Sequence, residues 1–399
     1  PDQDDFRLLP HYTTVVVERL GISFDEGFIS PKKDPIMSLC PNSLVSTLSC
    51  HLALSNSRLE TLATLIVGCI SARTVNLSHL AGHFCGAAQP ASYYRRVQRF
   101  FQYVRLDEGW LAQLIIRMLQ LRAPFTLCLD RTTWKIGDKH INLLVLCIAA
   151  RRVRIPVMWH VLDRAGNSSN RECIALLQRY IACCGRDTIN IVLADREFIG
   201  GQWFEFLVKN DIPFAIRVRN NLMVELDNGR CVPLKFLFAR TIGKVYRGRF
   251  ADMDDSLADH ISFAAKRLKD RSILIIASNI TARTALNLYR KRWQIECLFG
   301  DTKKRGLNME DTHLKHPGKL ALLLAIVTLA MAWAHASASI IKGKTGIKRA
   351  GHGYRRKSWF RTGFDILRTW LSHFPDQAKL VWVTMWNRRP NTRKSVRVV

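Results

Sequence analysis

The chain has 399 residues, of which 48% are hydrophobic and 23% are charged, a composition typical of a globular protein with a sizeable core. This balance excludes an intrinsically disordered chain. Lysine and arginine number 60 against 32 aspartates and glutamates, so the formal net charge is +28. A globular protein with such an excess of positive charge usually binds a polyanion. Charge alone leaves DNA, RNA and an anionic membrane surface as candidate partners.

The first part of the chain divides into an extension and a helical region. Residues 1–38 are mildly acidic and predict a loop-rich N-terminal extension without a signal peptide. Residues 39–122 carry helical apolar repeats and predict a helical DNA-binding domain. In its basic segment PASYYRRVQRFFQYV, Ser92 is the candidate N-cap. A helix-turn-helix reader and a small bundle with solvated arginines explain this segment equally well. Three of its arginines are the candidate DNA contacts: Arg95, Arg96 and Arg99.

The pattern changes from helical to strand-like at Pro124. The runs FTLCLDRT, INLLVLCIAA and IPVMWHVLD are followed by alternating helices and strands, which predicts an α/β sheet. Neither GxGxxG nor GxxxxGK[ST] occurs, which excludes the usual nucleotide-binding glycine loops. The units expected after the helical region are a first part of the α/β core (123–219), a β-rich insertion with its own small sheet (220–280), a second part of the core with a glutamate-bearing helix (281–341) and a basic C-terminal region (342–399).

Leu320 to Ile341 form an apolar segment without Asp, Glu, Lys or Arg, long enough to span a bilayer. Its second half is only weakly hydrophobic, which favours a buried core helix over a membrane span. We therefore expect no membrane partner. The eleven cysteines include no CxxC pair, so they predict reduced thiols of a cytoplasmic protein and argue against a disulfide framework or a zinc site.

Two aspartates follow apolar strand-like runs, Asp130 in LCLDRT and Asp195 in LADREF. The carboxyl ends of strands in α/β sheets are where functional sites gather. In an RNase H-like strand order the first and fourth strands are neighbours, so the two carboxylates would lie side by side and repel each other unless a cation or proton separates them. Carboxylate ligands without a His/Cys cluster favour Mg²⁺, with Mn²⁺ as a substitute. Glu197 is expected to point to the opposite side if the strand continues past Asp195. Arg131 and Arg196 are candidates for neutralising nearby phosphates.

A third carboxylate, Glu296, lies in the basic segment YRKRWQIECLFGDTKK. On a regular helix of about 100° per residue, four side chains fall within an arc of about 60°: Tyr289, Arg292, Glu296 and Lys303. An ion pair of Arg292 with Glu296 would contribute only about 0.2–0.5 kcal/mol and would not explain the other two residues. Glu296 is therefore the candidate third metal ligand.

These motifs resemble a known family of enzymes. The spacing Tyr289-x2-Arg292-x3-Glu296-x6-Lys303, together with the blocks LDRTTW and LADREF, is similar to the DDE transposases of bacterial insertion sequences. Within them it resembles the fourth insertion-sequence family, the Tyr-Arg-Glu-Lys signature group. The segments SYYRRVQRFF and GYRRKSWFRTGFD are similar as well.

The resemblance implies an RNase H-like catalytic core in which Asp130, Asp195 and Glu296 bind two Mg²⁺ ions, or Mn²⁺ in their place. Such ions activate water or a DNA 3′-hydroxyl for phosphoryl transfer. It also implies that Tyr289, Arg292 and Lys303 contact transposon-end DNA. The implied partners are double-stranded DNA, as terminal inverted repeats and as target, bound by a homodimer. The implied reaction is cut-and-paste transposition in a bacterial cytoplasm.

One departure from the family pattern concerns DNA hairpin formation. Relatives that cut through a hairpin stack a flipped base on a tryptophan in the strand before the glutamate helix, where this chain has RSILIIASN with Leu274. Trp134 and Trp293 are the aromatic residues near the motifs, and Trp293 is expected to be a packing residue. Two other functions remain open from sequence. They are a non-catalytic DNA-binding relative of transposases and a metal-dependent nuclease of the same fold without strand transfer.

Overall fold

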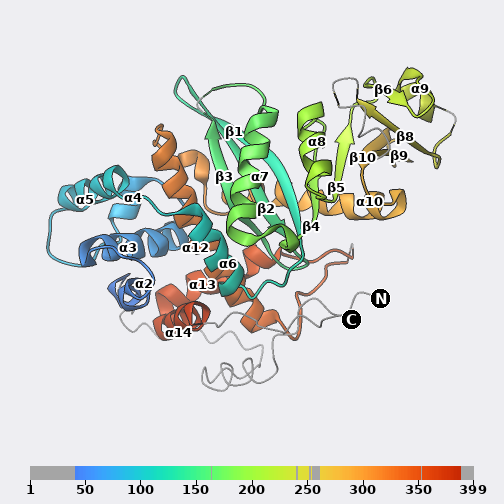
Figure 1. Ribbon diagram of the computed structural model, residues 1–399. Coiled ribbons are helices and arrows are strands. Elements are labelled where there is room, and N and C mark those ends of the chain that lie inside the picture. The colour runs from blue at the N-terminus through green and yellow to red at the C-terminus, as the bar shows by residue number, and fades with distance from the viewer. Residues whose placement is uncertain are drawn as a thin grey trace, which may run out of the picture.

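The computed structural model describes residues 41–162, 164–239, 241–250, 253, 261–351 and 353–387. The expected N-terminal extension (1–38) and the last residues of the basic C-terminal region lie outside this part. In the described part, helices gather at one end of the molecule and a sheet extends toward the other (Figure 1).

The helical region before the sheet is built around one long buried helix, α3. In chain order its elements are η1 (Pro41–Leu44), α2 (Val45–Ser49), α3 (Asn56–Ala72), α4 (Leu77–Ala81), α5 (Pro90–Tyr103) and α6 (Glu108–Met118). Asn76 caps α4 by accepting from the backbone N–H of Ser78. α5 begins with Pro90, whose fixed φ suits the first turn of a helix. The prediction that Ser92 caps this helix is therefore wrong.

The core is a mixed α/β sheet. The described strands form a ten-stranded sheet in the order β3-β2-β1-β4-β5-β10-β9-β8-β6-β7. Its first five strands are β1 (Phe125–Ile136), β2 (Lys139–Ala149), β3 (Arg154–Leu162), β4 (Ile189–Ala194) and β5 (Phe214–Val218). β1 is antiparallel to β2 and parallel to β4, β2 is antiparallel to β3, and β4 is parallel to β5. This order, with the first strand beside the fourth, is consistent with an RNase H-like nuclease fold, as predicted.

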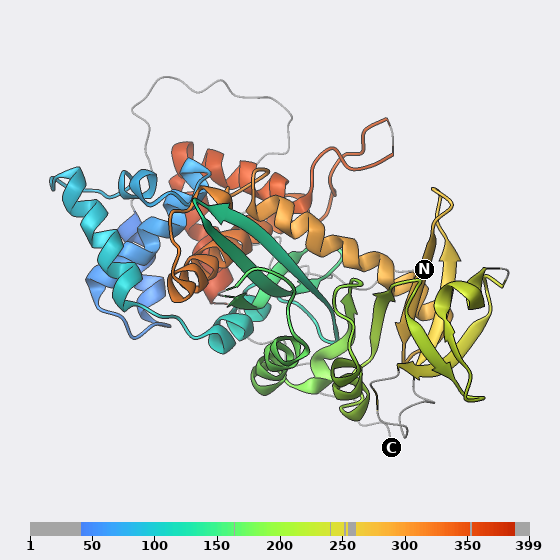
Figure 2. The same ribbon diagram turned by 90° about the horizontal axis from the view of Figure 1, so that it is seen from above.

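Helices cover both faces of these strands, which explains why the strands read as continuous apolar runs. α7 (Asn170–Cys184), η2 (Arg186–Thr188) and α8 (Gly201–Lys209) connect β3, β4 and β5. α7 starts with a capping box, in which Ser169 and Glu172 satisfy each other's backbone N–H groups. α7 and α8 lie on one side of the sheet, and the helices after β10 cross the other side (Figure 2).

The residues between β5 and the second part of the core continue the main sheet. They form β6 (Met223–Leu226), β7 (Cys231–Pro233), α9 (Leu234–Phe238), β8 (Val245–Phe250), β9 (Ser262–Arg267) and β10 (Ile273–Ser278). β10 is antiparallel to β5, and β9 and β8 follow it in the sheet. The predicted β-rich segment is therefore present. The prediction of a separate small sheet is wrong, because β10 pairs with the open edge of β5 and the other strands of the segment follow β10 in the same sheet.

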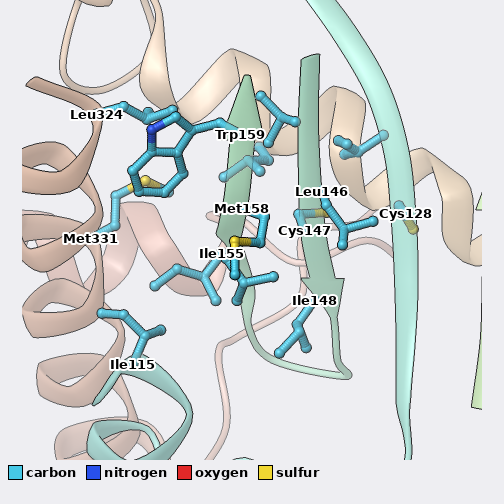
Figure 3. Close-up of a cluster of buried hydrophobic side chains, with 14 of the residues drawn as sticks. Ile115, Cys128, Leu146, Cys147, Ile148, Ile155, Met158, Trp159, Leu324 and Met331 are labelled. Carbon is cyan, nitrogen blue, oxygen red and sulfur yellow. The ribbon is translucent and has the colours of Figure 1, made fainter. Parts of the chain in front are cut away.

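The second part of the core contains α10 (Ala282–Tyr289), η4 (Arg290–Arg292), α11 (Trp293–Thr302), η5 (Met309–Asp311) and α12 (Pro317–Lys342). By length and composition α12 could cross a membrane, with a mean hydropathy of 1.9, but 94% of its most apolar stretch is buried inside the protein. Leu324 and Met331 of α12 lie against Trp159 of β3 (Figure 3). The prediction of a buried core helix is confirmed.

Two helices of the basic C-terminal region complete the helical end of the molecule. α13 (Trp359–His373) and α14 (Pro375–Trp386) contact α12, and α13 also contacts α3. The helices from both ends of the chain therefore share one core (Figure 1). α13 approaches α12 very closely, since a Cβ atom on Gly363 would lie 1.8 Å from the carbonyl oxygen of Ala334. Most aromatic residues of these two helices, such as Phe360 and Phe364, are buried packing residues, and Tyr354 before α13 and Phe374 between the helices are exposed.

Candidate active site

Asp130 and Asp195 occupy adjacent positions on β1 and β4. The parallel pairing of these strands ends with Leu129 opposite Ala194, so the next residue along each chain segment is an aspartate. Asp195 follows the end of β4, but β1 continues to Ile136 along β2. The sequence suggested that Asp130 ends its strand, but the strand continues beyond it. It marks the point where pairing with β4 ends, and the adjacency expected from the strand order is present.

The charge of Asp130 is only partly compensated. Burial raises the pKa of the Asp130 carboxyl to about 7, and the nearby charges of Glu197 and Asp195 act in the same direction. The backbone N–H of Arg131 donates to Oδ1 of Asp130 at 2.8 Å, and this bond and Arg292 both oppose the shift. A proton or a cation beside Asp130 would therefore be stabilised.

Glu296 is connected to Asp130 through Arg292. Nη1 of Arg292 lies 3.3 Å from Oδ2 of Asp130, and Nη2 donates to Oε1 of Glu296. α11, which carries Glu296, is fixed on the sheet by the nearly buried Asp301, whose carboxylate lies 2.7 Å from Arg154 of β3. The i,i+4 ion pair considered from sequence is thus part of a larger arrangement, in which one guanidinium joins carboxylates from two elements.

The sequence predicted that the four signature residues lie on one regular helix, and this prediction is wrong. α10 ends at Tyr289, the 3₁₀ turn η4 ends at Arg292, and α11 carries Glu296. α11 does continue through Gly300, but it ends at Thr302, so that Lys303 is its C-cap residue. The 3₁₀ turn winds more tightly than an α-helix, and so the angles of a regular helix do not apply across it.

Lys303 lies near the site but has partners of its own. Its Nζ donates to the carbonyl oxygen of Thr133 at 3.2 Å and lies 3.0 Å from Glu310. It also lies over the ring of Trp134, at 5.8 Å from the centroid. Lys303 therefore contacts β1 three residues beyond Asp130.

Asp195 is contacted from two further elements. The hydroxyl of Tyr289 donates to Oδ1 of Asp195 at 3.4 Å, and Nη1 of Arg217 on β5 lies 3.9 Å from the same oxygen. Burial raises the pKa of the Tyr289 hydroxyl, so it stays protonated and can act as a donor. Arg217 was missed by the sequence reasoning. The available signal was a charged residue inside the apolar run FAIRV, on the strand after β4.

Arg131 is held by contacts within the protein. Its guanidinium donates to Glu197 at 2.8 Å, to the side chain of Asn167 at 3.0 Å and to the carbonyl oxygen of Gly166. Glu197 therefore faces the Asp130 side, and not the opposite side that was expected for a strand continuing past Asp195. The reason is that β4 ends at Ala194, so that Glu197 lies in a turn and strand alternation does not apply. A phosphate contact by Arg131 stays a prediction.

Comparison with known proteins identifies the catalytic region. Residues 123–333 match the family described as Transposase DDE domain, which is more than half of the chain. The chain belongs to this family. The match begins just before β1 and ends within α12, so it includes all three candidate carboxylates. Family membership indicates a transposase nuclease, an enzyme of DNA recombination.

Other comparisons add no functional detail. No curated protein matches the chain. Endonuclease V of Ciona intestinalis, in complex with a 24mer DNA containing an inosine followed by a ribo-adenosine, is similar at 10% identity and a TM-score of 0.28, over 48% of this chain and 95% of that one. The C-terminal lobe of a budding yeast Argonaute is similar at 12% identity and a TM-score of 0.23, over 89% of this chain and 80% of that one.

DDE transposase domains generally use divalent metal ions, so we asked whether the side chains of this site could bind one. Among the described residues, no group of three or more His, Cys, Asp and Glu side chains is gathered as a metal site. In the transposase domain Arg292 bridges Asp130 and Glu296. The donor set nevertheless fits a hard cation, because carboxylate oxygens are its preferred ligands and the charge of Asp130 is incompletely compensated.

The helical region of the transposase carries a polar groove of about 830 Å³ beside α5. Arg95 and Arg99 line it together with Lys319 at the start of α12. Arg96 instead faces α3, where it donates to Glu60 at 2.6 Å and to the carbonyl oxygen of Ser57 at 2.7 Å. The three arginines are thus divided between a groove and a helix contact. Their roles in DNA binding stay predictions.

Two exposed residues lie close to the carboxylates along the chain. Arg196, which directly follows Asp195, is exposed, as a phosphate contact would require. Trp293, which directly follows Arg292, is 61% exposed. The prediction that Trp293 is a packing residue is therefore wrong.

Proposed function

We propose that this protein is a cut-and-paste transposase of the fourth insertion-sequence family, which binds the terminal inverted repeats of its element, cleaves the DNA there and joins the ends to target DNA. The proposal is supported by the arrangement of Asp130, Asp195 and Glu296 within the region that matches the transposase DDE domain. A DNA-binding protein without nuclease activity has no use for carboxylates where DNA is bound, because they repel phosphate.

In this proposal Asp130, Asp195 and Glu296 hold two Mg²⁺ ions, for which Mn²⁺ can substitute. When bound, such ions activate water or a DNA 3′-hydroxyl and stabilise the charge of phosphoryl transfer. Arg292 leaves one of its two carboxylates and contacts a DNA phosphate, together with Lys303. Tyr289 keeps the Asp195 carboxylate oriented through its hydroxyl group. Arg196 neutralises a neighbouring phosphate.

The groove beside α5 would hold DNA next to the catalytic domain. Arg95 and Arg99 neutralise phosphates there, as their positions along the groove allow. Pairing the two ends of an insertion sequence requires two active sites, so we propose a homodimer on DNA. The enzyme would act in the bacterial cytoplasm on chromosomal or plasmid DNA.

The proposal is tested with a supercoiled plasmid that carries the matched repeats flanking the coding region of this protein, in the presence of Mg²⁺. We expect excision of the segment and joined products. Asp195→Ala should abolish cleavage and preserve binding to the repeats. Asp187→Ala is a matched control, because Asp187 is a fully exposed aspartate on η2. Cleavage by Asp195→Ala at the wild-type rate would overturn the site assignment.

The same assay separates the two alternatives. Nicking without joined products would favour a nuclease of the same fold without strand transfer. Binding without any cleavage would favour a non-catalytic relative of transposases. In either case the proposed transposition reaction is wrong.

A further inference from the structure

A basic hairpin connects α12 to α13. Arg349 and Arg355 form an antiparallel bridge, and the backbone N–H of Arg356 donates to the carbonyl oxygen of Lys348 at 3.0 Å. We call residues 347–357, apart from 352, the basic hairpin. In Figure 2 this orange-red segment extends away from the helices that it connects. Backbone hydrogen bonds define its shape, so its charged side chains are presented from an ordered scaffold.

The basic hairpin and the residues before it carry positive charge only. Residues 342–357 contain seven lysines and arginines and no aspartate or glutamate. Asp365 of α13 compensates one of these charges, at 2.8 Å from Nζ of Lys357. Arg355 and Arg356 are exposed, and neither has an acidic partner among the described residues. A projecting surface with this excess of positive charge attracts a polyanion.

The turn between β2 and β3 adds to this basic surface. Nη1 of Arg152 in the turn donates to the carbonyl oxygen of Gly343 at 3.0 Å, and its guanidinium lies 4.7 Å from the centre of the Trp359 ring. Burial lowers the pKa of Arg152, and the charges of Arg151 and Arg355 act in the same direction. Arg151 is exposed. The hairpin and the turn therefore form one continuous basic surface.

This basic surface lies at the other end of the sheet from the candidate active site. On β2 Val145 is opposite Asp130, and Arg151 follows six residues later, which is about 20 Å along an extended strand. Lys303 contacts Thr133, in the opposite direction along the sheet. Helices cover both faces of the strands between the two ends. One straight duplex over the carboxylates would therefore not follow the sheet to the hairpin.

We propose that the basic hairpin, together with Arg151, binds the phosphate backbone of a second DNA duplex while the first lies at the carboxylates. The ligand class is duplex DNA of any sequence, as target DNA is, because contacts from lysine and arginine to phosphates carry no base information. This inference rests on the proposed function, since joining an element to a target requires two duplexes on one protein. It assigns one of them to a surface remote from the catalytic residues.

The test measures capture of a second duplex without divalent metal, so that no cleavage occurs. The protein is first bound to immobilised repeat duplexes of about 20 base pairs, one for each chain, and a fluorescent duplex of unrelated sequence is then added. We expect the wild-type protein to retain the fluorescent duplex. Arg355→Ala with Arg356→Ala removes two phosphate contacts, so it should weaken this capture about tenfold at about 0.1 M salt and leave binding of the repeat unchanged.

Two further pairs of substitutions serve as controls. Arg355→Lys with Arg356→Lys retains both charges and should capture the second duplex nearly as well as the wild type. Arg58→Ala with Lys379→Ala removes two exposed cations from α3 and α14 and should leave the capture unchanged. Capture at the wild-type level by the alanine pair at Arg355 and Arg356 would overturn the proposal.

Two other outcomes would also show that the proposal is wrong. If lengthening the repeat duplex to about 40 base pairs blocks capture, the hairpin holds the flank of the first duplex. If the alanine pair at Arg355 and Arg356 captures the duplex normally but no longer binds phosphatidylglycerol vesicles, the hairpin binds a membrane surface. Failure of the transposase function is recognised separately, through cleavage in Mg²⁺, and the capture measured without metal does not depend on that result.

Discussion

Asp130 is the residue whose surroundings have the clearest consequence for pH dependence. Its folded-state pKa of about 7 lies above that of an unfolded aspartate, about 3.9. Between these two pH values the folded protein binds more protons at this residue than the unfolded chain does. The contribution of Asp130 to stability is therefore fully present below about pH 4 and is lost as the pH rises through 7.

Asp130→Asn should remove this pH dependence, because an amide does not ionise. Without divalent metal, we expect the variant to be more stable than the wild type at pH 8, by up to about 4 kcal/mol, and similar to it at pH 4. Urea unfolding at both pH values measures the difference. Asp376→Asn, at an exposed aspartate of α14, should show little change. An equal pH dependence in wild type and Asp130→Asn would contradict the prediction.

Neighbouring arginines on α5 have different surroundings and should respond differently to substitution. Arg96→Ala removes hydrogen bonds to Glu60 and Ser57 and should lower the free energy of unfolding by about 1–3 kcal/mol. Arg95 is exposed in the groove, so the free energy of unfolding of Arg95→Ala should stay within about 0.5 kcal/mol of the wild-type value. Chemical denaturation compares the two, and equal losses would show that the distinction is wrong.

The sequence contained the information that separates these arginines. Val97, Phe100 and Phe101 are the buried residues of α5, and Arg96 lies four residues before Phe100 on the buried side. Other residues could not be placed in this way. Glu197 faces the site because β4 stops at Ala194, and Arg292 reaches Asp130 through a contact between elements far apart in the sequence. Both depend on where an element ends or on tertiary packing, which periodicity does not report.

At the scale of elements, the strand order was predictable and the shape of the glutamate segment was not. Continuous apolar runs identified the strands that lead to Asp130 and Asp195, and the register of β1 with β4 places the aspartates side by side. The 3₁₀ turn between α10 and α11 has no distinct pattern, because a basic run such as RKR suits either kind of helix. The predicted insertion likewise joined the main sheet, since strand pairing at an open edge is a tertiary property.

The crossing of α12 and α13 should tolerate no added atom at Gly363. A Cβ atom would lie 1.8 Å from the carbonyl oxygen of Ala334, so Gly363→Ala must push the helices apart. We expect the free energy of unfolding to fall by about 1–3 kcal/mol, although alanine is a better helix former than glycine. Gly351→Ala is the matched control, because nothing lies within 4 Å of its Cβ position. Thermal unfolding of both variants tests this prediction. A Gly363→Ala variant that is as stable as the wild type would contradict the close approach of α12 and α13 at this position.

The whole molecule carries a net charge of +28, which should make its binding to DNA strongly dependent on salt. On a logarithmic plot of affinity against salt concentration, each phosphate contact contributes about one unit to the slope. A double substitution, Arg95→Ala with Arg99→Ala, should therefore reduce the slope by about two. Fluorescence anisotropy with a blunt duplex measures it.

A charge-preserving pair provides the control for this measurement. Arg95→Lys with Arg99→Lys keeps both positive charges and should leave the slope close to that of the wild type. If the alanine pair also leaves the slope unchanged, the groove beside α5 does not contact phosphates and DNA binds elsewhere on the protein.

The antiparallel pairing of β5 with β10 has a consequence for how this protein can be altered. Val218 lies opposite Ile275, so the chain leaves the core and re-enters it at neighbouring positions. The strands between them extend the main sheet from β10, so a change that keeps the core must fall at an exposed turn of this excursion, such as the residues 227–229 between β6 and β7. Added residues at such a turn would leave Asp195 and Glu296 in their places on either side of the excursion.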